Sequence, residues 1–170
     1  FAGPMDYIPA SMRNSTKDNY RPIGDYPMEQ GTRAHALALF VVLNSPITML
    51  PDAPSDYKRE QECTDFIAKI PVEWDETKLL QGKIAKYTVM ARRAGNDWFV
   101  GAITNWDQRT IELKTDFLKP GKYKLEAIQD GINANTRAED YKRVEMEFSA
   151  GKILNLNLAS GGGWVARISE

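Results

Sequence analysis

The chain has 170 residues, of which 42% are apolar and 26% charged, which is enough for one ordinary domain or two small ones. Its 22 basic and 23 acidic side chains give a net charge of −1 without a basic run, which argues against a nucleic-acid binder. The longest apolar run, residues 36–43, is far shorter than a membrane span, and one cysteine with one histidine excludes an internal disulfide and a Cys/His zinc site.

The N-terminal part predicts a short strand, a long loop and a helix. Residues 1–8 (FAGPMDYI) are apolar and punctuated by Gly and Pro, as expected of a buried strand and its exit. Residues 9–30 contain three prolines and no helical period, and loops longer than about 15 residues are usually functional or disordered. Residues 31–43 predict the best helix of the sequence, with Thr32 as its cap.

A second strand and a second helix follow. Residues 47–50 (ITML) form a short apolar run, and Ser55 or Asp56 is expected to cap a helix through residue 70. The order βαβα implies a parallel strand pair with a right-handed crossover. Because two βα units cannot bury a parallel sheet, we expect residues 1–73 to be the last portion of a larger α/β domain, which would begin upstream of Phe1.

Residues 74–170 change to a period of two, which is typical of antiparallel strands. Glycine-containing turns separate the segments, and seven short strands at this spacing predict an antiparallel β-sandwich. The hinge between the two parts is expected at residues 71–77. The predicted strands are residues 84–92, 98–104, 110–113, 123–129, 144–148, 153–158 and 164–168.

Four polar residues are candidates for a substrate pocket because α/β barrels build active sites at the carboxyl ends of their strands. Asp6 follows the first predicted strand, and Asp52 follows the second. Glu29 and Gln30 precede the long helix. Each also has a structural interpretation: Asp6 and Asp52 are suited to fixing turns, Asp6 also to pairing with an arginine of its own loop, and Glu29 and Gln30 suit the first turn of the helix.

The other residues with reactive side chains predict structural roles. His35 lies on a helix flank, Cys63 falls on the apolar stripe of its helix, and Glu60 is expected to be solvated or ion-paired. Residues 161–163 (GGG) lack the Lys-Ser/Thr of a phosphate loop. Tryptophans in an alternating strand pattern suit a core more than a sugar-stacking platform; these are Trp74, Trp98, Trp106 and Trp164. By themselves the residues provide no complete catalytic set.

Four segments nevertheless carry a specific resemblance. They are residues 3–14 (GPMDYIPASMRN), 27–77 (from PMEQGTRAHALALF to PVEWDET), 91–106 (ARRAGNDWFVGAITNW) and 158–168 (LASGGGWVARI). They resemble the C-terminal part of glycoside hydrolase family 97, which comprises α-glucosidases and α-galactosidases of polysaccharide-degrading bacteria. The resemblance runs through essentially all 170 residues and includes long irregular loops.

The resemblance implies an architecture of an N-terminal β-sandwich, a central (β/α)8 TIM barrel and a C-terminal β-sheet domain. Residues 1–73 would then be the last two βα units of the barrel, and residues 74–170 the C-terminal β-sandwich domain. It also implies a calcium-dependent, exo-acting parent enzyme. The family's catalytic and calcium-binding carboxylates precede the segment that matches residues 3–6, so the resemblance assigns no catalytic residue and no metal ligand to this chain.

We therefore expect this chain to supply part of the pocket wall, from residues 6–30 and 51–56, and an accessory domain, and to be inactive alone. The implied partners are an oligosaccharide substrate and the rest of the parent barrel with its N-terminal domain. The family implies a periplasmic or secreted location. The alternative is a free-standing, non-catalytic β-sandwich module that binds carbohydrate or protein.

Overall fold

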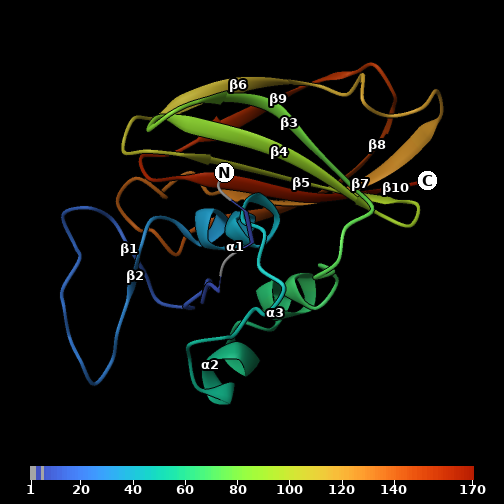
Figure 1. Cartoon of the computed structure of the whole chain (residues 1–170). Coiled ribbons are helices and arrows are strands. Elements are labelled where there is room, and N and C mark those ends of the chain that lie inside the picture. The colour runs from blue at the N-terminus through green and yellow to red at the C-terminus, as the bar shows by residue number, and fades with distance from the viewer. Residues whose placement is uncertain (1–2, 5) are drawn as a thin grey trace.

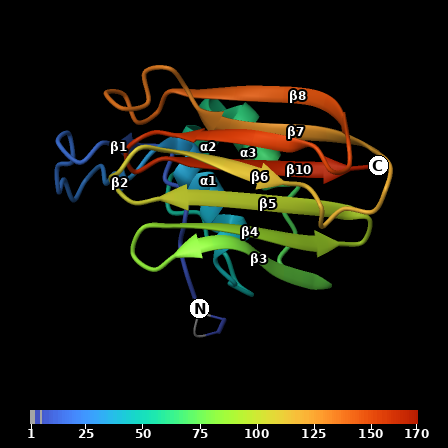
Figure 2. The same cartoon turned by 90° about the horizontal axis from the view of Figure 1, so that it is seen from above.

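The computed structural model describes residues 3–4 and 6–170, in which helices cover one face of a six-stranded sheet (Figure 1). The strand order is β3-β4-β5-β10-β7-β8, and every neighbouring pair is antiparallel (Figure 2). The strands are β3 (Glu76–Lys83), β4 (Tyr87–Ala94), β5 (Asp97–Thr104), β7 (Lys122–Asp130), β8 (Tyr141–Ser149) and β10 (Gly163–Ser169).

The other face of this sheet is covered by an antiparallel pair, β6 (Arg109–Lys114) and β9 (Ile153–Leu158). Figure 1 shows this pair and the helices on opposite sides of the large sheet. Alternating side chains of the strands point to the two faces. Val100 and Trp164 therefore pack toward β6 and β9, whereas Phe99 and Val165 pack toward the helices. The predicted antiparallel sandwich is confirmed.

The predicted strands match seven of these elements, and one strand was missed. Strand β3 begins at the end of the expected hinge and continues to residue 83. It was missed because an edge strand with exposed, polar side chains shows little alternation of apolar and polar residues. The expectation of a strand from residue 84 is wrong. Residues 84–86 form the turn between β3 and β4, where Ala85 has a positive φ of 61°.

Helix α1 (Arg33–Val42) confirms the prediction for residues 31–43. The Thr32 side chain accepts a hydrogen bond from the His35 backbone N–H, as an N-cap does. The helix lies across β5 and β10 at close range, because a Cβ on Gly101 would lie 2.8 Å from the Ala38 carbonyl oxygen. The helix thereby packs against the large sheet in a shared core that also includes Met12 of the long loop.

The second predicted helix is divided into α2 (Pro54–Arg59) and α3 (Gln61–Ile67), because Glu60 adopts φ −104° and ψ 47°. The expected cap at Ser55 or Asp56 is wrong: the helix begins at Pro54, which tolerates the first helical position because it lacks an N–H. The buried side chains of these helices include Cys63 and Phe66, which join the core beneath α1.

Within the described part of the chain, the two expected parallel strands of the N-terminal part are joined by a single β-bridge. A parallel bridge joins Tyr7 to Thr48, and Phe1, Ala2 and Met5 of the first expected strand lie outside the described residues. The long loop contains a second short parallel pair, β1 (Asn14–Ser15) with β2 (Glu29–Gln30). The described residues thus show parallel pairing here, but they do not show TIM-barrel units.

Candidate functional site

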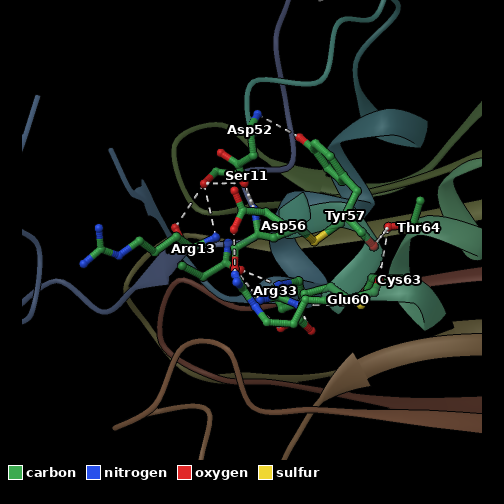
Figure 3. Close-up of polar contacts among 12 residues, drawn as sticks. Ser11, Arg13, Arg33, Asp52, Asp56, Tyr57, Glu60, Cys63 and Thr64 are labelled. Carbon is green, nitrogen blue, oxygen red and sulfur yellow. Dashed lines mark hydrogen bonds and ion pairs between the residues drawn. The ribbon is translucent and has the colours of Figure 1, made fainter. Parts of the chain in front are cut away.

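Two of the predicted pocket residues, Glu29 and Asp52, meet at the backbone of the loop that precedes β1. The Glu29 carboxylate accepts a 3.0 Å hydrogen bond from the Ser11 N–H. The Asp52 carboxylate accepts from the Ser11 hydroxyl at 3.3 Å and from the Met12 N–H at 2.5 Å (Figure 3). Carboxylates from segments more than 20 residues apart therefore hold adjacent backbone groups of one loop.

Helix α2 positions Asp52 through a tyrosine. The Tyr57 hydroxyl accepts from the Asp52 N–H at 3.1 Å and donates to the Ala10 carbonyl oxygen at 3.3 Å. Figure 3 shows Tyr57 reaching toward Asp52 from the helix. Burial of the phenol raises the pKa of Tyr57 to about 12. Tyr57 thus stays protonated at neutral pH and acts as a fixed bridge between the two loops.

A buried arginine lies behind these loops. Arg33 is 1% exposed, and its guanidinium donates to the Met12 carbonyl oxygen and to Asn14 Oδ1, each at 2.6 Å. It also donates to the Glu60 carboxylate at 3.0 Å. Glu60 is therefore ion-paired, as expected from the sequence, and Cys63 is a buried thiol whose pKa is raised by burial. A raised thiol pKa opposes a nucleophilic role for Cys63.

The Glu29 carboxyl has a raised pKa. Burial raises its pKa to about 7, the N–H groups of Ser11 and Ala10 oppose that rise, and the charge of Asp52 adds to it. A carboxyl with such a pKa exists in both protonation states near pH 7 and is able to donate to or accept from a hydroxyl group.

The other two predicted pocket residues are not part of this group. Gln30 follows Glu29 on β2 and is exposed, and Asp6 is exposed at the beginning of the described chain. A role of any of the four residues in substrate binding remains a prediction. Ser11 and Tyr57 were missed as members of the group, because nothing in a polar loop or on a helix stripe distinguishes a side chain that bridges two distant loops.

The remaining candidates have structural roles. Trp98 and Trp164 are buried in the sandwich core, and Trp106 lies against the backbone at Gly161, where a Cβ would fall within 2.4 Å of the indole ring. The His35 Nδ1 lies 3.1 Å from the Gly162 carbonyl oxygen. These contacts bind the loop before β10 to its surroundings.

Calcium does not fit the group formed by Glu29 and Asp52. A calcium site uses several convergent oxygen ligands, whereas both carboxylates are engaged by N–H donors. Among residues 3–4 and 6–170, no three His, Cys, Asp or Glu side chains cluster to hold a metal ion. No helix in that described part combines the length and the apolar character that crossing a membrane requires.

Known proteins similar to this chain are glycoside hydrolases. A "Retaining alpha-galactosidase" of Bacteroides thetaiotaomicron is 47% identical over 167 residues, which cover 98% of this chain and 25% of that protein. A "Probable retaining alpha-galactosidase" of Streptomyces bingchenggensis is 26% identical over 96% of this chain and 23% of that protein. The chain thus spans about a quarter of the length of these relatives.

Solved structures agree with these relatives. A Glycoside Hydrolase Family 97 enzyme from Pseudoalteromonas sp. strain K8 in complex with panose superposes with a TM-score of 0.88 at 34% identity. A Glycoside Hydrolase Family 97 enzyme from the same strain in complex with acarbose gives a TM-score of 0.84. Both comparisons cover 99% of this chain and 26% of the solved chain.

The family model described as "Glycosyl-hydrolase 97 C-terminal, oligomerisation" matches residues 73–169, which is more than half of the chain. The resemblance stated from the sequence is therefore confirmed. This chain belongs to glycoside hydrolase family 97, and residues 73–169 form the family's C-terminal domain.

Proposed function

We propose that this chain is the C-terminal quarter of an exo-acting α-glycosidase that removes terminal α-linked galactose or glucose. Its residues would supply part of the pocket wall and an accessory sandwich, while the catalytic carboxylates and the calcium ligands would lie on preceding barrel strands. The observation that carries the proposal is the 47% identity with a retaining α-galactosidase along 98% of this chain.

Exposed apolar side chains support the proposal that other elements of a barrel cover the N-terminal part. Large apolar residues rarely gather on the surface of a complete domain unless something covers them. Seven of them are exposed within residues 8–72: Ile8, Ile23, Tyr26, Ile47, Met49, Leu50 and Val72. Together with the parallel bridge between Tyr7 and Thr48, they are consistent with the closing units of a barrel whose other strands and helices would cover them.

The chemistry of the candidate site is compatible with sugar recognition. Exposed Gln30 offers both a donor and an acceptor, and Glu29 is able to accept or donate near neutral pH. The solved relatives in complex with panose and acarbose point to an oligosaccharide as the ligand class. We therefore place Glu29 and Gln30 at the rim of the pocket, with Asp52 fixing the loop behind it.

The test compares this chain with the complete polypeptide on aryl α-galactoside and aryl α-glucoside, with calcium and after chelation. We expect the complete polypeptide to hydrolyse at least one substrate in a calcium-dependent manner, and this chain alone to show no turnover. Turnover by this chain alone would mean that catalytic residues lie within it. A complete polypeptide that binds sugar without hydrolysing it would favour the non-catalytic binding module.

A second role, self-association, is favoured by an apolar groove and by the description of the matching family model. The groove, about 530 Å³, lies at the hairpin between β3 and β4 and is lined by Leu79, Ile84, Tyr87 and Ile103. We propose a second copy of the chain as its occupant. Light scattering should show a dimer that Ile84→Asp weakens. Ile132→Asp, at an equally exposed isoleucine outside the groove, should leave the dimer intact. A monomeric wild-type chain would exclude this role.

A further inference from the structure

Asp130, at the end of β7, is a buried carboxylate that the candidate site does not include. One of its oxygens accepts a 2.5 Å hydrogen bond from the Thr32 hydroxyl. The other accepts from the N–H groups of Ala159 at 2.8 Å and Gly163 at 3.0 Å. Asp130 therefore joins three segments: the residue that caps α1, the loop before β10, and its own strand in the sandwich.

The first turn of α1 depends on the sandwich for its backbone hydrogen bonds. The first N–H groups of a helix have no partner within the helix. Here the Thr32 N–H donates to the Gly161 carbonyl oxygen at 2.9 Å, and the Arg33 N–H donates to the Ala138 carbonyl oxygen at 2.8 Å. Loops of the C-terminal domain thus fix the start of the helix as well as its cap.

The chain leads directly from this junction to the candidate site. Gly31 precedes Thr32, and its N–H donates to the Ser15 carbonyl oxygen at 2.9 Å. Its φ of 105° favours glycine, and a Cβ there would lie 3.1 Å from the Gly161 carbonyl oxygen. A displacement of Thr32 must therefore move Gly31 and, with it, Glu29 and Gln30 on β2.

The carboxylate of Asp130 has little freedom to adjust. A Cβ on Gly162 would lie 2.0 Å from Asp130 Oδ2, so the glycine backbone passes directly over the carboxylate. A close-packed group with three fixed donors holds one position, and interiors packed in this way transmit displacements instead of absorbing them. A change at Asp130 is therefore expected to move the loop before β10 and the α1 cap together.

We propose that Asp130 is a positioning residue through which the C-terminal sandwich sets the place of Glu29 and Gln30 at the rim of the sugar pocket. The inference rests on the proposed function, because it assigns those two residues to the rim. Asp130 itself does not touch substrate: it acts through Thr32 and Gly31. The sandwich is then a part of the substrate site as well as a support for the barrel.

Two variants at Asp130 separate geometry from charge. Asp130→Ala removes the acceptor for all three donors. Asp130→Asn keeps one carbonyl oxygen for the two backbone N–H groups and offers an N–H to the Thr32 hydroxyl, which is also able to accept. In the complete polypeptide, we expect Asp130→Ala to raise KM by roughly tenfold with kcat nearly unchanged, and Asp130→Asn to restore most of the wild-type KM.

The matched control is Asp97→Ala. Asp97 begins β5, and its carboxylate binds Arg167 at 2.6 Å. The Asp130 junction lies at the other end of the same strand, where the Thr104 N–H donates to the Gly162 carbonyl oxygen. Asp97→Ala should lower the melting temperature without changing KM. If Asp130→Ala does not fold, Thr32→Val tests the same bond from the other side, with Thr32→Ser as its rescue.

The outcomes are distinct. A raised KM in Asp130→Ala, its absence in Asp97→Ala and its rescue by Asp130→Asn would support the inference. Equal losses of stability in both alanine variants with an unchanged KM would overturn it. If the wild-type complete polypeptide has no activity, the proposed function fails. In that case, amide hydrogen exchange measured on this chain tests the positioning role of Asp130 without activity. The Ser11 and Gly31 amides should exchange faster in Asp130→Ala than in Asp97→Ala. Equal exchange rates in the two variants would reject the positioning role.

Discussion

The guanidinium of Arg33 lies 3.0 Å from the carboxylate of Glu60, although Arg33 begins α1 and Glu60 separates α2 from α3. The arginine is 1% exposed and 27% of the Glu60 side chain is exposed, so the pair joins a buried guanidinium to a half-buried carboxylate. Because Arg33 also donates to the Met12 carbonyl oxygen and to Asn14 Oδ1, it connects the two helical segments to the loop that carries the candidate site.

Removing either partner of this pair should destabilise the chain to different degrees. Arg33→Met removes the buried partner of Glu60 and leaves the Met12 carbonyl oxygen and Asn14 Oδ1 without their donor, and we expect it to lower the free energy of unfolding by about 3–5 kcal/mol. Glu60→Gln keeps the shape of a half-buried side chain and should cost about 1–2 kcal/mol. Urea unfolding measures both. The control is Arg59→Gln: Arg59 is an exposed arginine that pairs with Asp56 and lies 4.0 Å from Glu60, so its loss should change little. Equal effects at Arg33 and Arg59 would contradict the prediction.

Asp130 should make stability depend on pH. Burial raises its pKa from 3.8 to about 6, although its hydrogen bonds from Thr32, Ala159 and Gly163 oppose the rise. The folded chain then binds this proton more tightly than the unfolded chain does, so its contribution is present below pH 3.8 and is lost as the pH rises through 6.

Asp130→Asn cannot titrate and should remove that dependence. Between pH 4 and 7, the free energy of unfolding of the wild type relative to this variant should fall by on the order of 2 kcal/mol. Asp116→Asn, at an exposed carboxylate, controls for the loss of a negative charge. Parallel pH profiles for the wild type and Asp130→Asn would show that the group titrates normally.

The Glu29 carboxyl should titrate near neutrality and respond to its neighbour. Carbon NMR of the side-chain carboxyl should give a pKa of about 7, because burial disfavours the charged form. In Asp52→Asn, the pKa of Glu29 should fall, since the charge of Asp52 raises it, yet it should stay above 4.5 because burial is the larger cause. A wild-type value near 4.5 would refute the assignment of Glu29 as a group active near neutral pH.

Gly101 should be required where α1 crosses β5. A Cβ there would lie 2.8 Å from the Ala38 carbonyl oxygen and 3.0 Å from Val41 Cβ, so Gly101→Ala must push the helix away from the sheet. We expect a loss of about 1–3 kcal/mol in the free energy of unfolding. Gly121→Ala, which would meet only a tyrosine ring at 3.5 Å, should stay within about 0.5 kcal/mol. Equal stabilities would mean that the crossing is looser than described.

Most regular elements followed from local pattern. Strand β9 has the predicted bounds and α1 begins after the predicted cap, because alternation and helical periodicity report burial directly in these segments. Strand β3 was missed because its place at the sheet edge leaves Leu79 61% exposed. The division at Glu60 was missed because the apolar stripe continues across it, and the ion pair of Glu60 with Arg33, 27 positions away, is equally invisible to a local pattern.

The candidate site was predictable only in part. Glu29 was selected because it precedes an expected helix, and its carboxylate contacts the backbone of Ser11. Asp52 was selected because it follows an expected strand, and its carboxylate contacts the backbone of Met12. No local pattern related these two residues to Tyr57, and no local pattern indicated that Asp130 would be a buried hydrogen-bond acceptor. Its sequence context, an Asp-Gly at the end of a strand, is typical of any turn.

By itself the sequence determined the change from a helical N-terminal part to an antiparallel sandwich, the cap at Thr32 and the family, since these rest on local periodicity and on long matching segments. Only the tertiary structure decided that Thr32 is held by Asp130 and that Arg33 pairs with Glu60. The physical reason is distance along the chain: a buried charge is placed by donors and acceptors from remote segments, and no local pattern specifies which of them will meet.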